Sequence, residues 1–113
     1  MRVAVIGSRS LAVTNLEEYL PADVTEIISG GARGIDTSAR QYAKAHGIKL
    51  TEYLPEYELY GRAAPIRRNV TIISNADLVL AFWDGVSRGT AFVIEECKKR
   101  KIPCKVYIQH QDL

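Results

Sequence analysis

The fold is decided by the stretch Ser29-Gly30-Gly31-Ala32-Arg33-Gly34-Ile35-Asp36. It follows a short apolar run at residues 25–28 and precedes an amphipathic stretch at residues 36–46, so the pattern predicts a strand, a turn and a helix. Its glycines allow positive φ angles and a close approach of the backbone to a ligand. A glycine-rich turn that leads into a helix N-terminus is typical of phosphate sites, and we expect an anion here rather than a plain tight turn.

Outward from this turn, apolar runs alternate with amphipathic stretches. The runs predict strands at residues 2–6, 25–28, 48–53, 78–82 and 105–108, and the amphipathic stretches predict helices at 14–20, at 36–46, from Pro65 onward and at 90–101. Strands that are joined by helical crossovers form a parallel sheet with helices on both faces. We therefore predict one α/β domain over residues 1–113, in which residues 48–53 form an edge strand.

The composition argues against several function classes. The net charge of +2 is too small to indicate a nucleic acid or an acidic membrane as the partner. No apolar run reaches the length that spans a membrane, so we expect a cytoplasmic protein. The spacing of Cys97 and Cys104 is not that of a metal site or a redox pair, and we expect two unpaired cysteines, no metal ion and no cofactor.

Arginine and lysine are segregated along the chain. Ligands of parallel α/β sheets bind outside the carboxyl ends of the strands, and six arginines follow the first four strands: Arg9, Arg33, Arg62, Arg67, Arg68 and Arg88. The lysines fall on helices or at strand starts instead. One or two of these arginines would pair with Asp36, Asp84 or Glu56, but six on one edge indicate recognition of phosphate or carboxylate.

Two more loops end at the same edge. Residues 7–10, Gly7-Ser8-Arg9-Ser10, follow the first strand, and residues 83–90, Trp83-Asp84-Gly85-Val86-Ser87-Arg88-Gly89-Thr90, follow the fourth. Gly89 and Thr90 at a helix start favour a phosphate, whereas Ser87 is equally well explained as an N-cap. The rings of Trp83, Tyr57 and Tyr60 lie near enough to this edge to stack on a base, although each ring is also explained by packing.

Four motifs carry a resemblance to a known superfamily. They are VIGSRS in the first turn, SGGARGID in the second, Tyr60-Gly61 followed by PIRRN, and ADLVLAFWDGVSRGT in the fourth. On these motifs the chain resembles the YspA-type branch of the SLOG superfamily, which groups DNA-processing A (Smf) proteins with Lonely-guy phosphoribohydrolases. The resemblance implies a Rossmann-like sheet of order 3-2-1-4-5, with a switch point between the first and fourth strands, and a nucleotide-like ligand.

The chain departs from the catalytic pattern of the Lonely-guy enzymes. Where their PGGxGTxxE motif carries the glutamate, this chain has an apolar residue, and the nearest glutamates, Glu95 and Glu96, come later on the same predicted helix. Both glutamates are also explained as ion-pair partners on their own helix. Neither His46 nor His110 belongs to the predicted edge, so an acid–base group there has to be a carboxylate.

Three functions stay open. The leading hypothesis is a domain that binds a nucleotide or a nucleotide-derived phosphate as sensor, carrier or processing domain. Its predicted ligand-binding residues are Gly7, Ser8, Arg9, Gly30, Gly31, Arg33, Gly34, Asp36, Arg62, Trp83, Ser87, Arg88, Gly89 and Thr90.

The second hypothesis is an enzyme that cleaves a base from a nucleoside monophosphate, in which Arg67 or Arg68 holds the phosphate and Glu95 or Asp84 faces the ribose. The third is a single-stranded DNA-binding protein of the DNA-processing A type. We expect a small nucleotide-like ligand and a homodimer, and neither a membrane nor a nucleic acid as partner.

Overall fold

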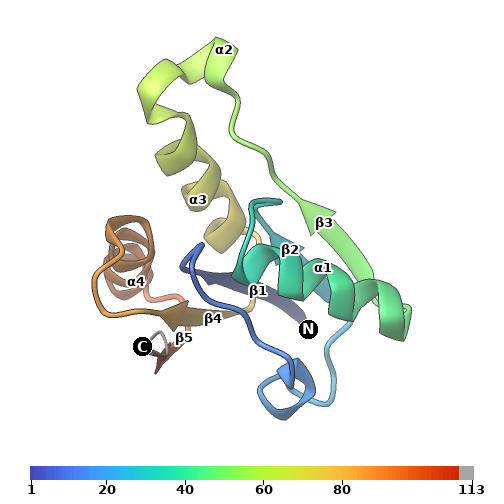
Figure 1. The fold of residues 1–113 in the computed structure, drawn as a ribbon. Coiled ribbons are helices and arrows are strands. Elements are labelled where there is room, and N and C mark those ends of the chain that lie inside the picture. Colours follow the sequence, from blue (N-terminus) through green and yellow to red (C-terminus); the bar gives the residue numbers. More distant parts are fainter. Residues whose placement is uncertain (110–113) are drawn as a thin grey trace.

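The computed structural model of the chain describes residues 1–109, and His110 lies outside them. Five strands form one parallel sheet: β1 (Arg2–Gly7), β2 (Glu26–Ser29), β3 (Lys49–Glu52), β4 (Leu78–Trp83) and β5 (Cys104–Ile108). The strand order is β3-β2-β1-β4-β5, as Figure 1 shows, so the predicted fold class and strand order are confirmed. The order reverses between β1 and β4, where the carboxyl ends of the strands open a place for a ligand.

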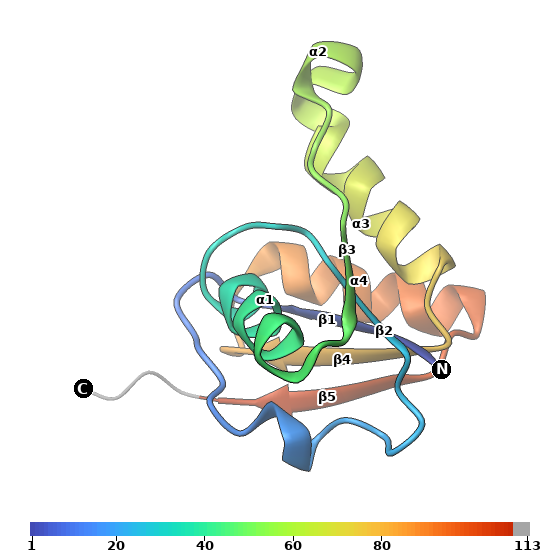
Figure 2. The ribbon, with the colours of Figure 1, turned by 90° about the vertical axis from the view of Figure 1, so that its right-hand side faces the viewer.

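The two faces of the sheet bury separate hydrophobic cores. Alternate residues of a strand point to opposite faces, so Val3 and Val5 enter one core and Ala4 and Ile6 enter the other. Helix α1 (Ile35–His46) covers the first face. Helices α3 (Ala64–Ser74) and α4 (Arg88–Arg100) cover the second (Figure 2). The buried Cys97 belongs to this second core and, like Cys104, forms no disulfide, as expected.

The helix predicted at residues 14–20 is wrong. Only a short 3-10 turn, η1 (Leu16–Glu18), forms there. The buried side chains of this connection are Leu11, Val13 and Leu16, and their spacing of two and three residues suits an extended chain rather than a helix. The segment lies against α1, where the Val13 amide donates a 3.0 Å hydrogen bond to the Ser38 hydroxyl.

A second short helix departs from the sequence prediction. Helix α2 (Tyr57–Tyr60) and the 3-10 turn η2 (Gly61–Ala63) follow β3 and lead into α3. Figures 1 and 2 show that α2 and the first turns of α3 project away from the sheet. Only the last turn of α3 enters the core, through Ile72 and Ile73. Among residues 1–109, no helix has the length and apolar character needed to cross a membrane.

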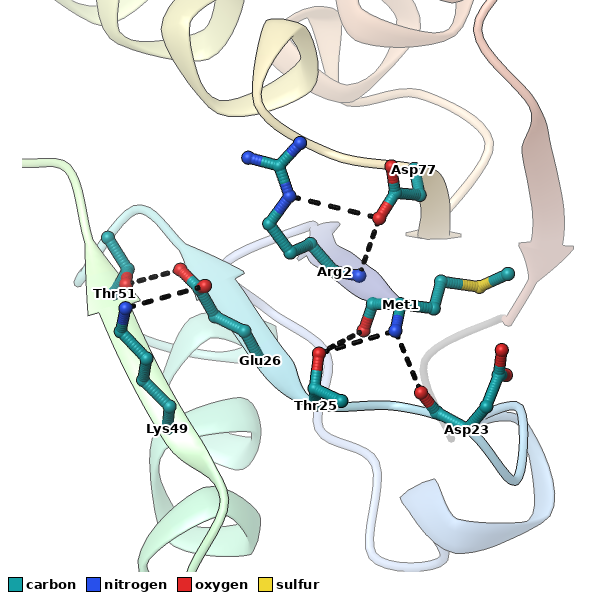
Figure 3. A network of polar contacts seen from close by, with 8 residues as sticks. All are labelled: Met1, Arg2, Asp23, Thr25, Glu26, Lys49, Thr51 and Asp77. Atoms are coloured by element: carbon teal, nitrogen blue, oxygen red, sulfur yellow. Dashed lines mark hydrogen bonds and ion pairs between the residues drawn. The ribbon is translucent and has the colours of Figure 1, made fainter.

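The amino-terminal edge of the sheet is closed by paired polar groups, shown in Figure 3. The amino terminus donates to the Asp23 carbonyl at 2.8 Å, and the Arg2 amide donates to the Asp77 carboxylate at 2.7 Å. Glu26 accepts a 2.6 Å hydrogen bond from the Thr51 hydroxyl and pairs with Lys49. The charged groups of this edge therefore have partners within the chain.

Candidate functional site

A cavity of about 300 Å³ opens at the carboxyl edge, at the predicted switch point. It lies between the end of β1, the glycine-rich turn before α1, the first half of α3 and the start of α4. All four motifs of the sequence analysis contribute to its wall. The predicted residues that line it are Gly7, Ser8, Arg9, Gly30, Asp36, Arg68, Ser87, Gly89 and Thr90.

Sequence reasoning missed part of the α3 wall. Pro65, Arg68, Asn69 and Ile72 all line the cavity, and they recur at the i, i+3, i+4 and i+7 positions of one helix face. Only Arg68 among them was predicted. The polar residue of the missed set is Asn69, whose side-chain amide can both donate and accept hydrogen bonds. The i+4 spacing of Asn69 from Pro65 is the sequence signal that would have identified it.

Other predicted residues lie away from this cavity. Gly31 and Arg33 line a shallow depression beside Arg9, and Arg67 lines a second cavity on the far side of α3 from the sheet edge. Six more line none of these three cavities: Gly34, Arg62, Trp83, Asp84, Arg88 and Glu95. The indole N–H of Trp83 donates to the Ser87 carbonyl at 3.0 Å, and its ring packs against the second core, so Trp83 is not placed to stack on a base.

The glycine-rich turn packs against the protein itself. A side chain at Gly30 would place its Cβ 2.5 Å from Nη1 of Arg68, and one at Gly34 would overlap the backbone of Arg9. The Ala32 amide already donates to Oδ2 of Asp36 at 3.1 Å. Gly34 occupies the N-cap position of α1, so Asp36 does not cap this helix. The Ala32 amide is therefore not free to bind the anion expected at this turn.

The start of α4 offers open backbone donors. Ser87 stands at the N-cap position, but its hydroxyl donates to Oδ2 of Asp84 at 2.7 Å and forms no capping bond. Within residues 1–109, the amides of Arg88, Gly89 and Thr90 donate to no other group. Gly89 and the largely buried Thr90 line the cavity, so unpaired N–H groups and the positive end of the helix dipole meet there.

The arginines of the carboxyl edge have no acidic partners. Arg2, Arg40 and Arg100, which lie elsewhere, each form an ion pair with Asp77, Glu52 and Glu96 respectively. In the described part of the chain, no ion pair is formed by the six edge arginines: Arg9, Arg33, Arg62, Arg67, Arg68 and Arg88. None of them therefore forms a close ion pair with Asp36, Asp84 or Glu56 among the described residues, although the charges of Arg68 and Asp36 do interact. Arg9 and Arg68 are the two that line the cavity.

Arg68 and Asp36 form the deepest charged part of the site. Nη1 of Arg68 donates to the carbonyls of Gly30 at 2.8 Å and Tyr53 at 3.4 Å, while its buried Nε has no partner among the described residues. Burial lowers the pKa of Arg68, and the nearby Asp36 carboxylate opposes that change. Burial likewise raises the pKa of Asp36, against the Ala32 amide, the neighbouring Ser29 hydroxyl and the charge of Arg68.

The two carboxylates predicted to be catalytic point elsewhere. Asp84 holds its own loop, since its Oδ1 accepts hydrogen bonds from the amides of Val86 at 2.9 Å and Ser87 at 2.7 Å. Glu95 is exposed and pairs with Lys98 at 3.4 Å. Neither lines the cavity, and Asp36 is the carboxylate that does so within residues 1–109.

The two aspartates titrate in opposite directions from their ordinary value. Hydrogen bonds from Val86 and Ser87 lower the pKa of Asp84 to about 2, whereas burial raises that of Asp36 above 3.8. Asp84 thus contributes stability above pH 3.8 that is lost as the pH falls through 2, and the Asp36 contribution declines as the pH rises from 3.8 through its folded pKa.

We expect carboxyl-carbon NMR to show both titrations, with the signals assigned through Asp84→Asn and Asp36→Asn. An Asp84 midpoint at or above 3.8 would show that its hydrogen bonds do not persist in solution.

Comparison with known proteins adds one relative. No protein-family model matches the chain, and no solved structure matches it. The Gene 61 protein of Mycobacterium phage D29 is 35% identical over 83 residues, which make up 68% of this chain and 66% of that protein. The chain therefore spans just under two thirds of the length of that relative.

Proposed function

We propose that this protein binds the phosphate group of a nucleotide or a nucleotide derivative in the cavity at the carboxyl edge. One observation carries the proposal: the open amides of Gly89 and Thr90, the guanidinium of Arg9, which forms no ion pair, and Arg68, whose Nε has no partner among the described residues, line the same cavity. An anion there would satisfy donors that otherwise have no partner in the protein, and each such charge-assisted bond is short and strong. The hydroxyls of Ser8 and Thr90 add neutral donors.

The same site supports the proposal that the chain is a YspA-type SLOG protein. The four motifs of that resemblance are far apart in the sequence, and each supplies residues to one cavity: Gly7 to Arg9, Gly30 to Asp36, Pro65 to Asn69, and Ser87 to Thr90. Loops after parallel strands meet at one edge in any such sheet, but these four motifs bring polar residues, among them Ser8, Arg68 and Thr90, into one cavity. Their convergence is what a shared ligand site requires.

Binding is favoured over cleavage of an N-glycosidic bond. A phosphoribohydrolase needs a carboxylate at the ribose, and Glu95 and Asp84 both lie outside the cavity. Asp36 lines it but accepts a hydrogen bond from Ala32 and lies beside Arg68. We therefore expect intact AMP after prolonged incubation with the protein.

A compact ligand is also favoured over a DNA strand. A strand is bound along a basic track that follows several phosphates, whereas the cavity of about 300 Å³ is lined by only two of the six edge arginines. The lysines that would extend a track lie on helix bodies or strand starts, as do Lys49, Lys98 and Lys99.

The proposal is tested by comparing two arginines of the same edge. Arg9 and Arg88 are both exposed and unpaired, but only Arg9 lines the cavity. We expect Arg9→Gln to weaken AMP binding roughly 10- to 100-fold in isothermal titration, as loss of a charge-assisted bond predicts, and Arg88→Gln to change it less than about twofold. The two variants lose the same charge, so bulk electrostatics cannot produce a difference between them.

Two results would contradict the proposal. The first is wild-type protein that binds neither inorganic phosphate nor AMP, and the second is equal loss of AMP affinity in the two variants. Tighter binding of a single-stranded oligonucleotide than of AMP at physiological salt would favour the DNA-binding alternative instead.

A further inference from the structure

A second cavity, of about 500 Å³, adjoins the cavity that is proposed to hold the phosphate, the phosphate cavity. Arg68 lines both, so the two share a wall at its side chain. The second cavity lies around the solvent side of α3, between the segment after β3 and helix α4. Its volume falls within the usual range for small-molecule pockets.

The two cavities differ in chemistry. Glycines, hydroxyls and open amides line the first, whereas the second is lined largely by aromatic and aliphatic side chains, among them Tyr53, Tyr60, Ile66 and Phe92. Ile66 is 50% exposed and Tyr60 is 39% exposed. Apolar surface left open to water beside a polar cavity is characteristic of a ligand site whose occupant covers it.

Its charged residues suit a flat, electron-rich group. The guanidinium of Arg67 lies over the ring of Tyr60, with 4.8 Å between Cζ and the ring centroid. Arginine planes and tyrosine rings both stack on flat aromatic groups. Glu56 and Glu96 also line the cavity. Glu96 pairs with Lys99 and Arg100, whereas Glu56, which forms no ion pair among the described residues, shares the lining with three arginines: Arg67, Arg68 and Arg100.

We propose that the second cavity holds the nucleobase of the ligand whose phosphate occupies the first. This inference rests on the proposed function, and it assigns the base to the surface formed by Tyr60, Arg67 and Ile66. Arg68 lines both cavities, so in this proposal the nucleotide passes from one to the other beside the Arg68 side chain. Tyr57, the other tyrosine of α2, is 57% exposed and lines neither cavity.

The test separates the contributions of phosphate and base. Wild-type protein is titrated with inorganic phosphate, ribose 5-phosphate, AMP and UMP by isothermal titration calorimetry. We expect AMP or UMP to bind roughly 5- to 100-fold more tightly than ribose 5-phosphate, the gain that stacking of one base on aromatic side chains produces. Tyr60→Ala should remove most of this gain and leave ribose 5-phosphate affinity unchanged.

Tyr57→Ala is the matched control, because it removes the same ring from the same short helix outside the cavity, and it should preserve the gain. If Tyr60→Ala does not fold, Ile66→Ala serves the same purpose. Binding of ribose 5-phosphate with no gain for either nucleotide would overturn this inference and leave the proposed function standing.

Failure of every ligand to bind would overturn the proposed function and this inference with it. A gain that survives in both Tyr60→Ala and Ile66→Ala would also overturn the inference. If Tyr60→Ala converts a dimer to a monomer in light scattering without reducing the gain, the cavity is an interface between two copies of the chain and the inference fails.

Discussion

Gly34→Ala is expected to lower the free energy of unfolding by about 3 kcal/mol or more, as backbone strain and overpacking together predict. Gly34 has φ 74° and ψ −124°, a combination that L-residues rarely adopt. A Cβ at this position would also lie 2.6 Å from the carbonyl carbon of Arg9 and 2.7 Å from its Cα. The overlap is with backbone, so no side-chain rotation relieves it, and the loop after β1 has to move.

Gly61→Ala is the matched control for this prediction. Gly61 has φ 54° and ψ −127°, close to the angles of Gly34, and nothing lies within 4 Å of a Cβ built on it. Gly61→Ala should therefore lower the free energy of unfolding only by the backbone strain, about 1–2 kcal/mol. Urea unfolding followed by circular dichroism measures both variants, and equal losses would show that the loop after β1 accommodates a side chain at Gly34 without cost.

The same substitution should affect the ligand. Arg9 lines the phosphate cavity, and its backbone is what the added Cβ displaces, so Gly34→Ala should weaken AMP binding as well as stability. Gly61 lies in the projecting region and makes no contact with the cavity lining. In this view Gly34 affects ligand binding because it supports the loop after β1. It does not act by bringing its own amide close to the phosphate.

The sheet was predictable because its strands are buried on both faces. Residues 3–6 and 78–82 are continuous apolar runs, and a strand covered by helices on both sides requires that pattern. The crossover at residues 14–20 was not predictable in the same way. Its polar and apolar residues fit a helix by count, but Leu11 and Val13 reach the core from irregular chain and Leu16 from the 3-10 turn η1, and only the tertiary fold decides between these and a helix.

The site was predictable in part for a similar reason. Loops after parallel strands must meet at one edge, so Ser8, Gly30 and Thr90 could be brought together from sequence alone. The directions of individual side chains could not. Arg67 and Arg68 are adjacent in sequence, but consecutive residues of a helix point about 100° apart, and only Arg68 reaches the phosphate cavity.

The roles of the carboxylates could not be predicted from the sequence either. Nothing in the sequence distinguishes a catalytic aspartate from one that accepts hydrogen bonds from the amides of its own turn. The hydrogen bonds from Val86 and Ser87 show that Asp84 does the latter. Gly30 and Gly34 were predicted to admit a phosphate, yet Gly30 makes room for Arg68 and Gly34 for Arg9. A glycine needed for contact between two loops and one needed for a ligand look identical in a sequence.

Arg68→Met should both destabilise the protein and abolish phosphate binding. The substitution removes the bonds from Nη1 to the Gly30 and Tyr53 carbonyls, at 2.8 and 3.4 Å, and takes the positive charge away from Asp36. Losing hydrogen bonds of a charged group and leaving buried acceptors unpaired costs about 2–4 kcal/mol. Methionine keeps much of the apolar stem, so the loss reports mainly on the guanidinium.

Arg67→Met is the control for Arg68→Met. The neighbouring residue is exposed and loses the same charge, but its described contact is the Tyr60 ring at 4.8 Å from Cζ. An exposed cation–π contact is worth about 0.5–1 kcal/mol. We therefore expect a small loss of stability in Arg67→Met and preserved binding of inorganic phosphate. If both variants lose the same amount of stability and of phosphate affinity, Arg68 contributes no more than Arg67 does.

The pH dependence identifies the cause of the Arg68 effect. The charge of Arg68 lowers the pKa of Asp36, against the larger effect of burial that raises it. In Arg68→Met this opposing term is absent, so the pKa of Asp36 rises further and the protein loses more stability as the pH rises through the ionisation of Asp36. The deficit relative to wild type should therefore grow with pH above 3.8 and shrink in the background of Asp36→Asn. A deficit that stays constant with pH and survives in Asp36→Asn would mean that the carbonyl bonds alone account for it, with no electrostatic coupling between Arg68 and Asp36.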